Sequence, residues 1–269
     1  MNSEINLIVT DLDGTLFNSQ HQLTERTEKA LKAAIEKGVK VVLATGKTRI
    51  SGQDVVQRLN LDTPGIYLQG LAIYNADGTI RWQQTLDPKV ARTAINAGED
   101  RGFSMVAYSG TRVLVRARNR DTDELLKYHE GTPEVVGPLQ NILDTTPINK
   151  VLAIKLAQPR QVTALRWQLS MQINGTGKLV QALDDMLEIL PPGCSKGAAL
   201  KLLLKDLDIP AQQVMAIGDG ENDIEMVQLA GTGVAVGNAH PGLKAVARHV
   251  VVSNDEDGVA EAVERFVLA

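Results

Sequence analysis

Two kinds of hydrophobic pattern alternate along the chain. Residues 5–10, 39–45 and 214–218 are short and almost continuously aliphatic, which indicates strands buried on both faces, as in a parallel sheet between helix layers. Longer segments at 24–38 and 195–207 carry apolar residues at helical spacing. The same alternation continues at 222–231, 233–236, 249–252 and 258–267. The pattern predicts an α/β fold with a Rossmann-like, doubly wound parallel sheet.

The middle of the chain has a different pattern. Residues 72–82 and 103–117 have the composition of β-hairpins, with turn residues near the centre of each. Further elements are expected as helices at 87–101, 121–130 and 159–172 and as a strand pair at 178–185 and 186–192. We therefore predict a core formed by residues 1–83 and 187–269, with an α+β domain inserted at 84–186.

Composition narrows the class of protein. The 269 residues are 43% hydrophobic and 22% charged, a balance that excludes a disordered chain. Aromatic residues make up only 3% and the net charge is −4, with no basic run, so we expect no nucleic-acid partner. No stretch of about 18 apolar residues is present to span a membrane. With the single cysteine Cys194 and no secretory leader, we expect a cytoplasmic protein, and no protein partner can be inferred.

Polar residues follow three of the predicted strands. Asp11, Thr45 and Asp219 stand just past the aliphatic segments. Because parallel strands end at one edge of the sheet, where ligands bind, these three side chains are expected to lie close together.

The loop after the first strand carries two carboxylates, Asp11 and Asp13, followed by Gly14. Glycine permits a tight turn that exposes backbone N–H groups to an anion. An ordinary turn or a helix cap explains these three residues about as well when they are taken alone.

The second strand ends in Thr45-Gly46. A hydroxyl and a helix N-terminus can together bind one phosphate, although a simple helix cap is the safer interpretation of these residues alone. A nucleotide-binding P-loop is excluded, because Val41 occupies the position where that motif requires glycine.

Two further polar positions complete the pattern. Lys196 stands at a predicted helix start, where the helix dipole disfavours a cation unless an anion is bound; the alternative is a solvated lysine. Asp219 and Asp223 follow the strand at 214–218. They would repel a pyrophosphate but suit Mg²⁺; the alternative is an acidic turn that caps the next helix.

Taken together, these motifs resemble those of a known family. The motifs are DLDGTL at 11–16, ATG at 44–46, SKGAAL at 195–200 and GDGENDIEM at 218–226. In this order, they resemble the haloacid dehalogenase-like superfamily, and more narrowly its Cof-type hydrolases of subclass IIB, which are Mg²⁺-dependent phosphatases. The resemblance implies a phosphomonoesterase with a substrate-selecting cap, acting through an aspartyl-phosphate on a small phosphorylated metabolite, either a sugar phosphate or a phosphorylated cofactor.

The resemblance also implies roles for single residues. Asp11 corresponds to the nucleophile and Asp13 to the general acid and base. The implied Mg²⁺ ligands are Asp11, Asp13 and Asp219, and the implied phosphate ligands are Thr45, Gly46, Lys196 and Asn222. Asp223 and Lys47 correspond to supporting positions. The chain departs from the family pattern at Lys47, where many relatives carry arginine, and at Gln69-Gly70, where many carry Asn-Gly.

Two other functions are kept as alternatives. A phosphotransferase such as a phosphomutase can use the same fold, and product analysis with labelled sugar phosphates would distinguish it. A non-catalytic binding module is the alternative from another class. The intact Asp11, Asp13 and Lys196 argue against it, since a silent protein has no need of them.

Overall fold

The structure is a computed structural model that describes residues 4–269, apart from the side chain of Ala182. It contains two compact units. The first holds the chain up to Gly46 together with residues 52–82 and 195–269, and the second holds residues 47–51 and 83–194. Each unit has its own sheet and its own hydrophobic core.

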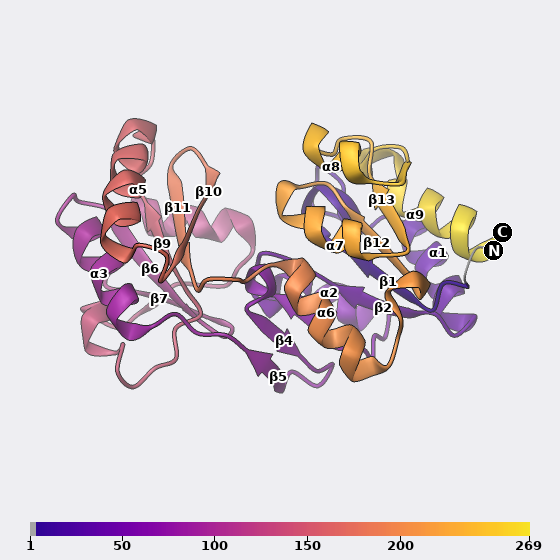
Figure 1. Ribbon diagram of the computed structural model, residues 1–269, viewed down its shortest axis with the longest axis horizontal. Coiled ribbons are helices and arrows are strands. Elements are labelled where there is room, and N and C mark those ends of the chain that lie inside the picture. The colour runs from indigo at the N-terminus through magenta and orange to yellow at the C-terminus, as the bar shows by residue number, and fades with distance from the viewer. Residues whose placement is uncertain (1–3) are drawn as a thin grey trace. The chain divides into compact units, whose positions relative to one another are not determined.

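A five-stranded parallel sheet forms the centre of the first unit (Figure 1). In spatial order its strands are β14 (His249–Val250), β13 (Thr232–Ala235), β12 (Val214–Gly218), β1 (Leu7–Thr10) and β2 (Lys40–Leu43). Every residue of β1 and β12 is buried, as expected for strands covered on both faces. The predicted α/β class with a parallel sheet is confirmed.

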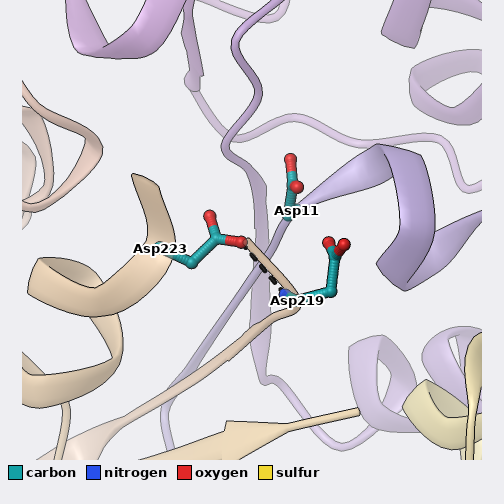
Figure 2. A group of neighbouring side chains, drawn as sticks. All are labelled: Asp11, Asp219 and Asp223. Carbon is teal, nitrogen blue, oxygen red and sulfur yellow. Dashed lines mark hydrogen bonds between the residues drawn. The ribbon is translucent and has the colours of Figure 1, made fainter. Parts of the chain in front are cut away.

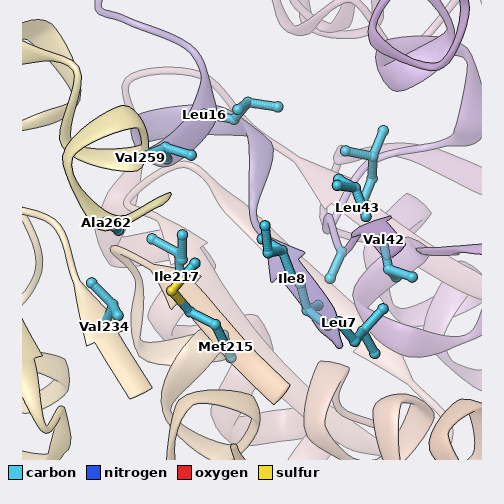
Figure 3. Packing of buried hydrophobic residues seen from close by; sticks show 14 of the residues in the cluster. Leu7, Ile8, Leu16, Val42, Leu43, Met215, Ile217, Val234, Val259 and Ala262 are labelled. Carbon is cyan, nitrogen blue, oxygen red and sulfur yellow. The ribbon is translucent and has the colours of Figure 1, made fainter. Parts of the chain in front are cut away.

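Helices pack against this sheet and bury its aliphatic side chains. They are α1 (Glu25–Glu36), α2 (Gln53–Arg58), α6 (Lys196–Leu207), α7 (Ile224–Leu229), α8 (Pro241–Val246) and α9 (Gly258–Val263). Figure 3 shows Ile217 of β12 packed close to Val259 and Ala262 of α9. Helix α1 begins where the Thr24 hydroxyl accepts from the N–H of Thr27, and the chain leaves it through Gly38 at φ 88°, so both expected helix boundaries are present.

A small sheet follows the second strand of the core. It consists of β3 (Gly65–Tyr67), β4 (Ala72–Tyr74) and β5 (Ile80–Gln83). The expected hairpin at 72–82 corresponds to β4 and β5, with its turn at Asp77-Gly78. Strand β3 was not expected from the sequence, because only three residues form it.

The second unit is an α+β structure built on a six-stranded sheet. Its strands are β10 (Lys178–Leu183), β11 (Met186–Leu190), β9 (Lys150–Ile154), β6 (Ser104–Ser109), β7 (Arg112–Val115) and β8 (Glu134–Val135), and its helices are α3 (Pro88–Glu99), α4 (Arg120–Asp123) and α5 (Pro159–Ile173). All its strand pairs are antiparallel except β7 with β8. Helices α3 and α5 supply much of its hydrophobic core.

Two details of the second unit differ from the sequence-based expectation. A continuous helix at 121–130 is wrong: α4 ends at Asp123 and a 3-10 segment covers Glu124–Tyr128. Leu125 is buried there but Leu126 is exposed, so no apolar stripe stabilises a longer helix. The second unit also continues to Cys194, because β11 pairs with β9 from Met186 to Ile189 and with β10 as far as Leu190.

None of the helices within residues 4–269 combines the length and the hydrophobicity needed to cross a bilayer.

Candidate active site

Two carboxylates meet at the carboxyl ends of adjacent strands. Asp11 directly follows β1 and Asp219 directly follows β12, and these strands pair in parallel. The pairing continues past β1, where the N–H of Asp11 donates to the carbonyl of Ile217 at 3.0 Å. Carboxylate oxygens of Asp11, Asp219 and Asp223 all lie within 4.8 Å of one another (Figure 2). The expected meeting of Asp11 and Asp219 is therefore present in the structure.

Thr45 lies at the same edge of the sheet. Strand β2 pairs with β1, and the N–H of Ala44 donates to the carbonyl of Thr10 at 2.9 Å. The N–H of Thr45 then donates to the carbonyl of Ile66 at 2.9 Å, and the residue is buried. Asp11, Thr45 and Asp219 thus mark the ends of three neighbouring strands.

Lys196 is drawn into the carboxylate group. Its Nζ lies 2.8 Å from Oδ1 of Asp11 and 2.7 Å from Oδ1 of Asp223, and only 1% of the residue is exposed. The alternative of a solvated lysine is therefore wrong. The Ser195 hydroxyl accepts from the N–H of Ala198 at 3.0 Å and caps α6, which places Lys196 at the first position of the helix. The two carboxylates offset the unfavourable helix dipole there.

Burial has the largest effect on the charges of this group. It raises the pKa of the Asp11 carboxyl well above its usual range, while Lys196 opposes that rise and Asp223 and Asp219 add to it. Burial likewise raises the pKa of Asp219, against the hydrogen bond from Thr15. Burial lowers the pKa of Lys196, but the charges of Asp11 and Asp223 outweigh it, so this pKa is raised overall. Three carboxylates face one ammonium group, and an all-oxygen set with excess negative charge suits a hard divalent cation.

Asp223 is held by donors on both of its oxygens. Oδ1 pairs with Lys196, and Oδ2 accepts from the N–H groups of Asp219 at 3.0 Å and Gly220 at 2.9 Å. A Cβ on Gly218 would lie 2.5 Å from the Cβ of Asp223, so only glycine fits there. Asp223 therefore caps the turn and also orients Lys196. Because both of its oxygens already have donors, Asp223 is less suited than Asp11 or Asp219 to bind a cation directly.

Asp219 is positioned by the loop that follows β1. The Thr15 hydroxyl donates to Oδ1 of Asp219 at 2.7 Å. Gly14 has φ 74°, and a Cβ on it would lie 2.5 Å from Oδ2 of Asp219. Asn238 holds this turn by donating from Nδ2 to the carbonyl of Gly14 at 2.8 Å. Sequence reasoning missed Thr15 and Asn238; Thr15 offered a signal as a hydroxyl within the DLDGT loop, whereas Asn238 offered none.

Asp13 differs from the other predicted site residues. Its Oδ1 lies 3.2 Å from Nδ1 of His21, and the two side chains are 36% and 30% exposed. Among residues 4–269, the cluster of three carboxylates does not include it. Sequence reasoning gave His21 no role, because a contact across an irregular loop leaves no periodic signal.

Asn222 is linked to the turn at Thr45 through Gln69. Its Nδ2 donates to Oε1 of Gln69 at 3.0 Å, and the N–H of Gln69 donates to the carbonyl of Thr45 at 3.2 Å. A Cβ on Gly46 would lie 2.5 Å from Nε2 of Gln69. Gln69 therefore contacts three of the predicted phosphate ligands, Thr45, Gly46 and Asn222. The predicted supporting residue Lys47, by contrast, belongs to the second unit.

Comparison with known proteins places this site in context. A family model described as haloacid dehalogenase-like hydrolase matches residues 8–263. The chain is 38% identical, over 96% of its length, to the Arabidopsis thaliana protein named endoribonuclease YBEY, chloroplastic, but spans only 46% of that relative. It is 32% identical to the HMP-PP phosphatase of Cronobacter sakazakii, covering 90% of this chain and 88% of the relative.

A solved structure agrees with these matches. The structure is that of a haloacid dehalogenase-like hydrolase from Bacteroides thetaiotaomicron, which superposes with a TM-score of 0.90 at 27% identity, covering 97% of this chain and 99% of that one. The predicted family resemblance is confirmed, and so is the predicted enzyme class, a phosphatase.

Proposed function

Because the chain belongs to the haloacid dehalogenase-like hydrolases, we propose that it is a Mg²⁺-dependent phosphomonoesterase that hydrolyses a small phosphorylated metabolite through an aspartyl-phosphate. The observation that carries this proposal is the arrangement of buried Asp11, Lys196 and Asp223 with half-buried Asp219 near the ends of β1 and β12. It supports the proposal because a carboxylate that can act as a nucleophile lies beside a fixed cation and further carboxylates.

Asp11 is the proposed nucleophile. Lys196 binds its Oδ1 at 2.8 Å, which fixes the direction of the other carboxylate oxygen. That oxygen attacks phosphorus, the bond between phosphorus and the leaving oxygen breaks, and Asp11 becomes an aspartyl-phosphate. Water then attacks the phosphorus, which releases inorganic phosphate and restores the Asp11 carboxylate.

Asp13 is the proposed general acid and base. It gives a proton to the leaving oxygen in the first step and takes one from the attacking water in the second, so its protonation state is restored at the end of the cycle. The partly exposed position of Asp13, outside the buried cluster, suits a group that must exchange protons with substrate and water. His21, with Nδ1 3.2 Å away, orients this carboxylate.

The carboxylate set fits a divalent cation. Asp11 and Asp219 offer carboxylate oxygens at one place beside Asp223, and these three carboxylates face the single ammonium group of Lys196. Asp11, Asp219 and the backbone carbonyl of Asp13 would hold Mg²⁺. When bound, the ion favours the ionised form of Asp11 and reduces its repulsion of the phosphate dianion.

The remaining predicted residues bind the phosphate in this proposal. Thr45 and Gly46 form a turn at the end of β2, Lys196 supplies a fixed positive charge, and Asn222 supplies an amide. These groups surround the transferred phosphoryl and offset its charge. Lys47, next to this turn in sequence, keeps its proposed supporting role.

The name of one relative supports a class of substrate. The Cronobacter relative is named as a phosphatase of HMP-PP, which supports a small phosphorylated metabolite, such as a sugar phosphate or phosphorylated cofactor. In the proposal, the inserted α+β domain is a cap that selects this substrate, and the enzyme is cytoplasmic.

The test is phosphate release from p-nitrophenyl phosphate with and without Mg²⁺. Wild-type protein is expected to release phosphate only with the ion. Asp11→Asn is expected to abolish release, while Asp62→Asn, an exposed aspartate of the same unit, leaves it unchanged. Turnover that survives Asp11→Asn would refute the assigned nucleophile. Transfer of the phosphoryl group to an added sugar in place of water would favour a phosphotransferase.

A further inference from the structure

A strained turn lies next to the proposed phosphate site. The three consecutive residues Leu68, Gln69 and Gly70 have φ angles of 54°, 61° and 89°. Glycine adopts this left-handed conformation freely, whereas leucine and glutamine do so rarely. Such strain persists only where surrounding contacts impose it, and it concentrates at functional sites.

The contacts that impose this conformation come from three predicted phosphate-binding segments. The N–H of Gln69 donates to the carbonyl of Thr45 at 3.2 Å. The side-chain Oε1 of Gln69 accepts from Nδ2 of Asn222 at 3.0 Å. Gly70 packs against the residue before Lys196, since a Cβ on it would lie 2.2 Å from the carbonyl oxygen of Ser195. The turn therefore joins loops that are far apart in the sequence.

The amide of Gln69 is oriented by these contacts. Asn222 binds its oxygen, so the nitrogen Nε2 lies on the other side, against Gly46, where an added Cβ would come within 2.5 Å of it. Within residues 4–269, no acceptor is hydrogen-bonded to Nε2. The turn thus presents a fixed, uncharged N–H donor beside the Thr45-Gly46 turn.

We propose that Gln69 is a further phosphate-binding residue of this site, in which Nε2 donates to an oxygen of a phosphate monoester while Oε1 holds Asn222 in place. The inference rests on the proposed function. A donor fixed before the ligand arrives loses little conformational freedom on binding, and a hydrogen bond to a charged oxygen is stronger than one between neutral groups. The contacts with Thr45 and Asn222 keep this donor in position against the backbone strain of Leu68 and Gln69.

Three variants of Gln69 separate its roles. Gln69→Ala removes the donor and the link to Asn222, and we expect the Ki of inorganic phosphate to rise roughly tenfold or more. Gln69→Glu keeps the acceptor for Asn222 but places a carboxylate where the donor was, so we expect a larger loss. Gln69→Gly removes the amide and also relieves the strain, so we expect phosphate affinity to fall without loss of thermal stability.

Asp208 provides a matched control. It also has a left-handed backbone, φ 54°, but it caps the far end of α6. Asp208→Gly relieves strain in the same way, and we expect no change in phosphate affinity.

Affinity is measured as product inhibition by inorganic phosphate and by calorimetric titration with phosphate in the presence of Mg²⁺. Weaker binding in all three Gln69 variants, with Gln69→Glu the weakest and Asp208→Gly unchanged, would support the inference. Phosphate binding within twofold of wild type in Gln69→Ala and Gln69→Glu would overturn it. If Asp11→Asn abolishes turnover while these variants behave as wild type, only the role of Gln69 fails; turnover that survives Asp11→Asn refutes the proposed function instead.

Discussion

Replacing Lys196 by methionine tests how strongly the site depends on one buried charge. The ammonium group is within 2.8 Å of Asp11 and 2.7 Å of Asp223, and the residue is 1% exposed. Methionine has a similar length without the charge. The substitution therefore leaves buried carboxylates without their cation, and breaking a buried pair in this way costs about 3–5 kcal/mol.

The expected loss is large enough to measure by thermal unfolding. For a unit of 150–250 residues, each 1 kcal/mol shifts Tm by about 2–4 °C, so we expect Lys196→Met to lower Tm by roughly 6–20 °C. Lys201→Met is the matched control, since Lys201 lies on the same helix and is exposed; we expect a shift of about 1–2 °C or less. The catalytic efficiency of Lys196→Met is expected to fall with the loss of its charge from the phosphate site.

A second substitution tests the electrostatic explanation. Asp223→Asn removes one of the two carboxylates that Lys196 neutralises, so in the Lys196→Met background it should restore about 1–3 kcal/mol of stability. If Lys196→Met unfolds within about 1 kcal/mol of Lys201→Met, or if Asp223→Asn destabilises the double variant further, the reasoning from buried charge is refuted.

Three further substitutions test other parts of the structure. Gly14→Ala should lower both stability, by about 1–3 kcal/mol, and activity, because φ is 74° and the new Cβ meets Asp219; wild-type unfolding would contradict this. Thr15→Val removes the 2.7 Å hydrogen bond to Asp219, so the Mg²⁺ concentration for half-maximal activity should rise about 10–100-fold, and an unchanged Mg²⁺ titration would argue against it. In the second unit, burial raises the pKa of Glu130, which accepts from the Tyr108 hydroxyl. The Glu130 carboxyl therefore binds its proton more tightly in the folded protein than in the unfolded chain, and its contribution to the free energy of unfolding falls as pH rises above the usual glutamate pKa. Glu130→Gln should flatten that fall in urea unfolding between roughly pH 5 and 8. An equally steep fall in the variant would refute the assignment.

The strands of the first unit were predictable because their continuous hydrophobic pattern indicates burial on both faces. Continuous aliphatic runs at β1, β2 and β12 have no polar face, and only a sheet covered on both sides accommodates them. Parallel strands share an edge at their carboxyl ends, so the sequence alone predicts that Asp11 and Asp219 lie close together.

The features that could not be predicted depend on tertiary contacts. The burial of Lys196 follows from carboxylates on two other loops, and by residue type alone a lysine is expected in solvent. Gln69 contacts Asn222 across a separation of 153 residues, and nothing local marks that partner. The end of α4 also depends on tertiary packing, because Leu125 is buried there and Leu126 is exposed.

Trapping the phosphorylated enzyme tests the central claim most directly. Wild-type protein is mixed with Mg²⁺ and a phosphate monoester, quenched with acid within the first turnover, digested and analysed by mass spectrometry. The account predicts a phosphoryl group on the peptide that contains Asp11, and none on that peptide in Asp11→Asn. Steady turnover with no phosphoryl group on Asp11, or with the group on another residue, would contradict it.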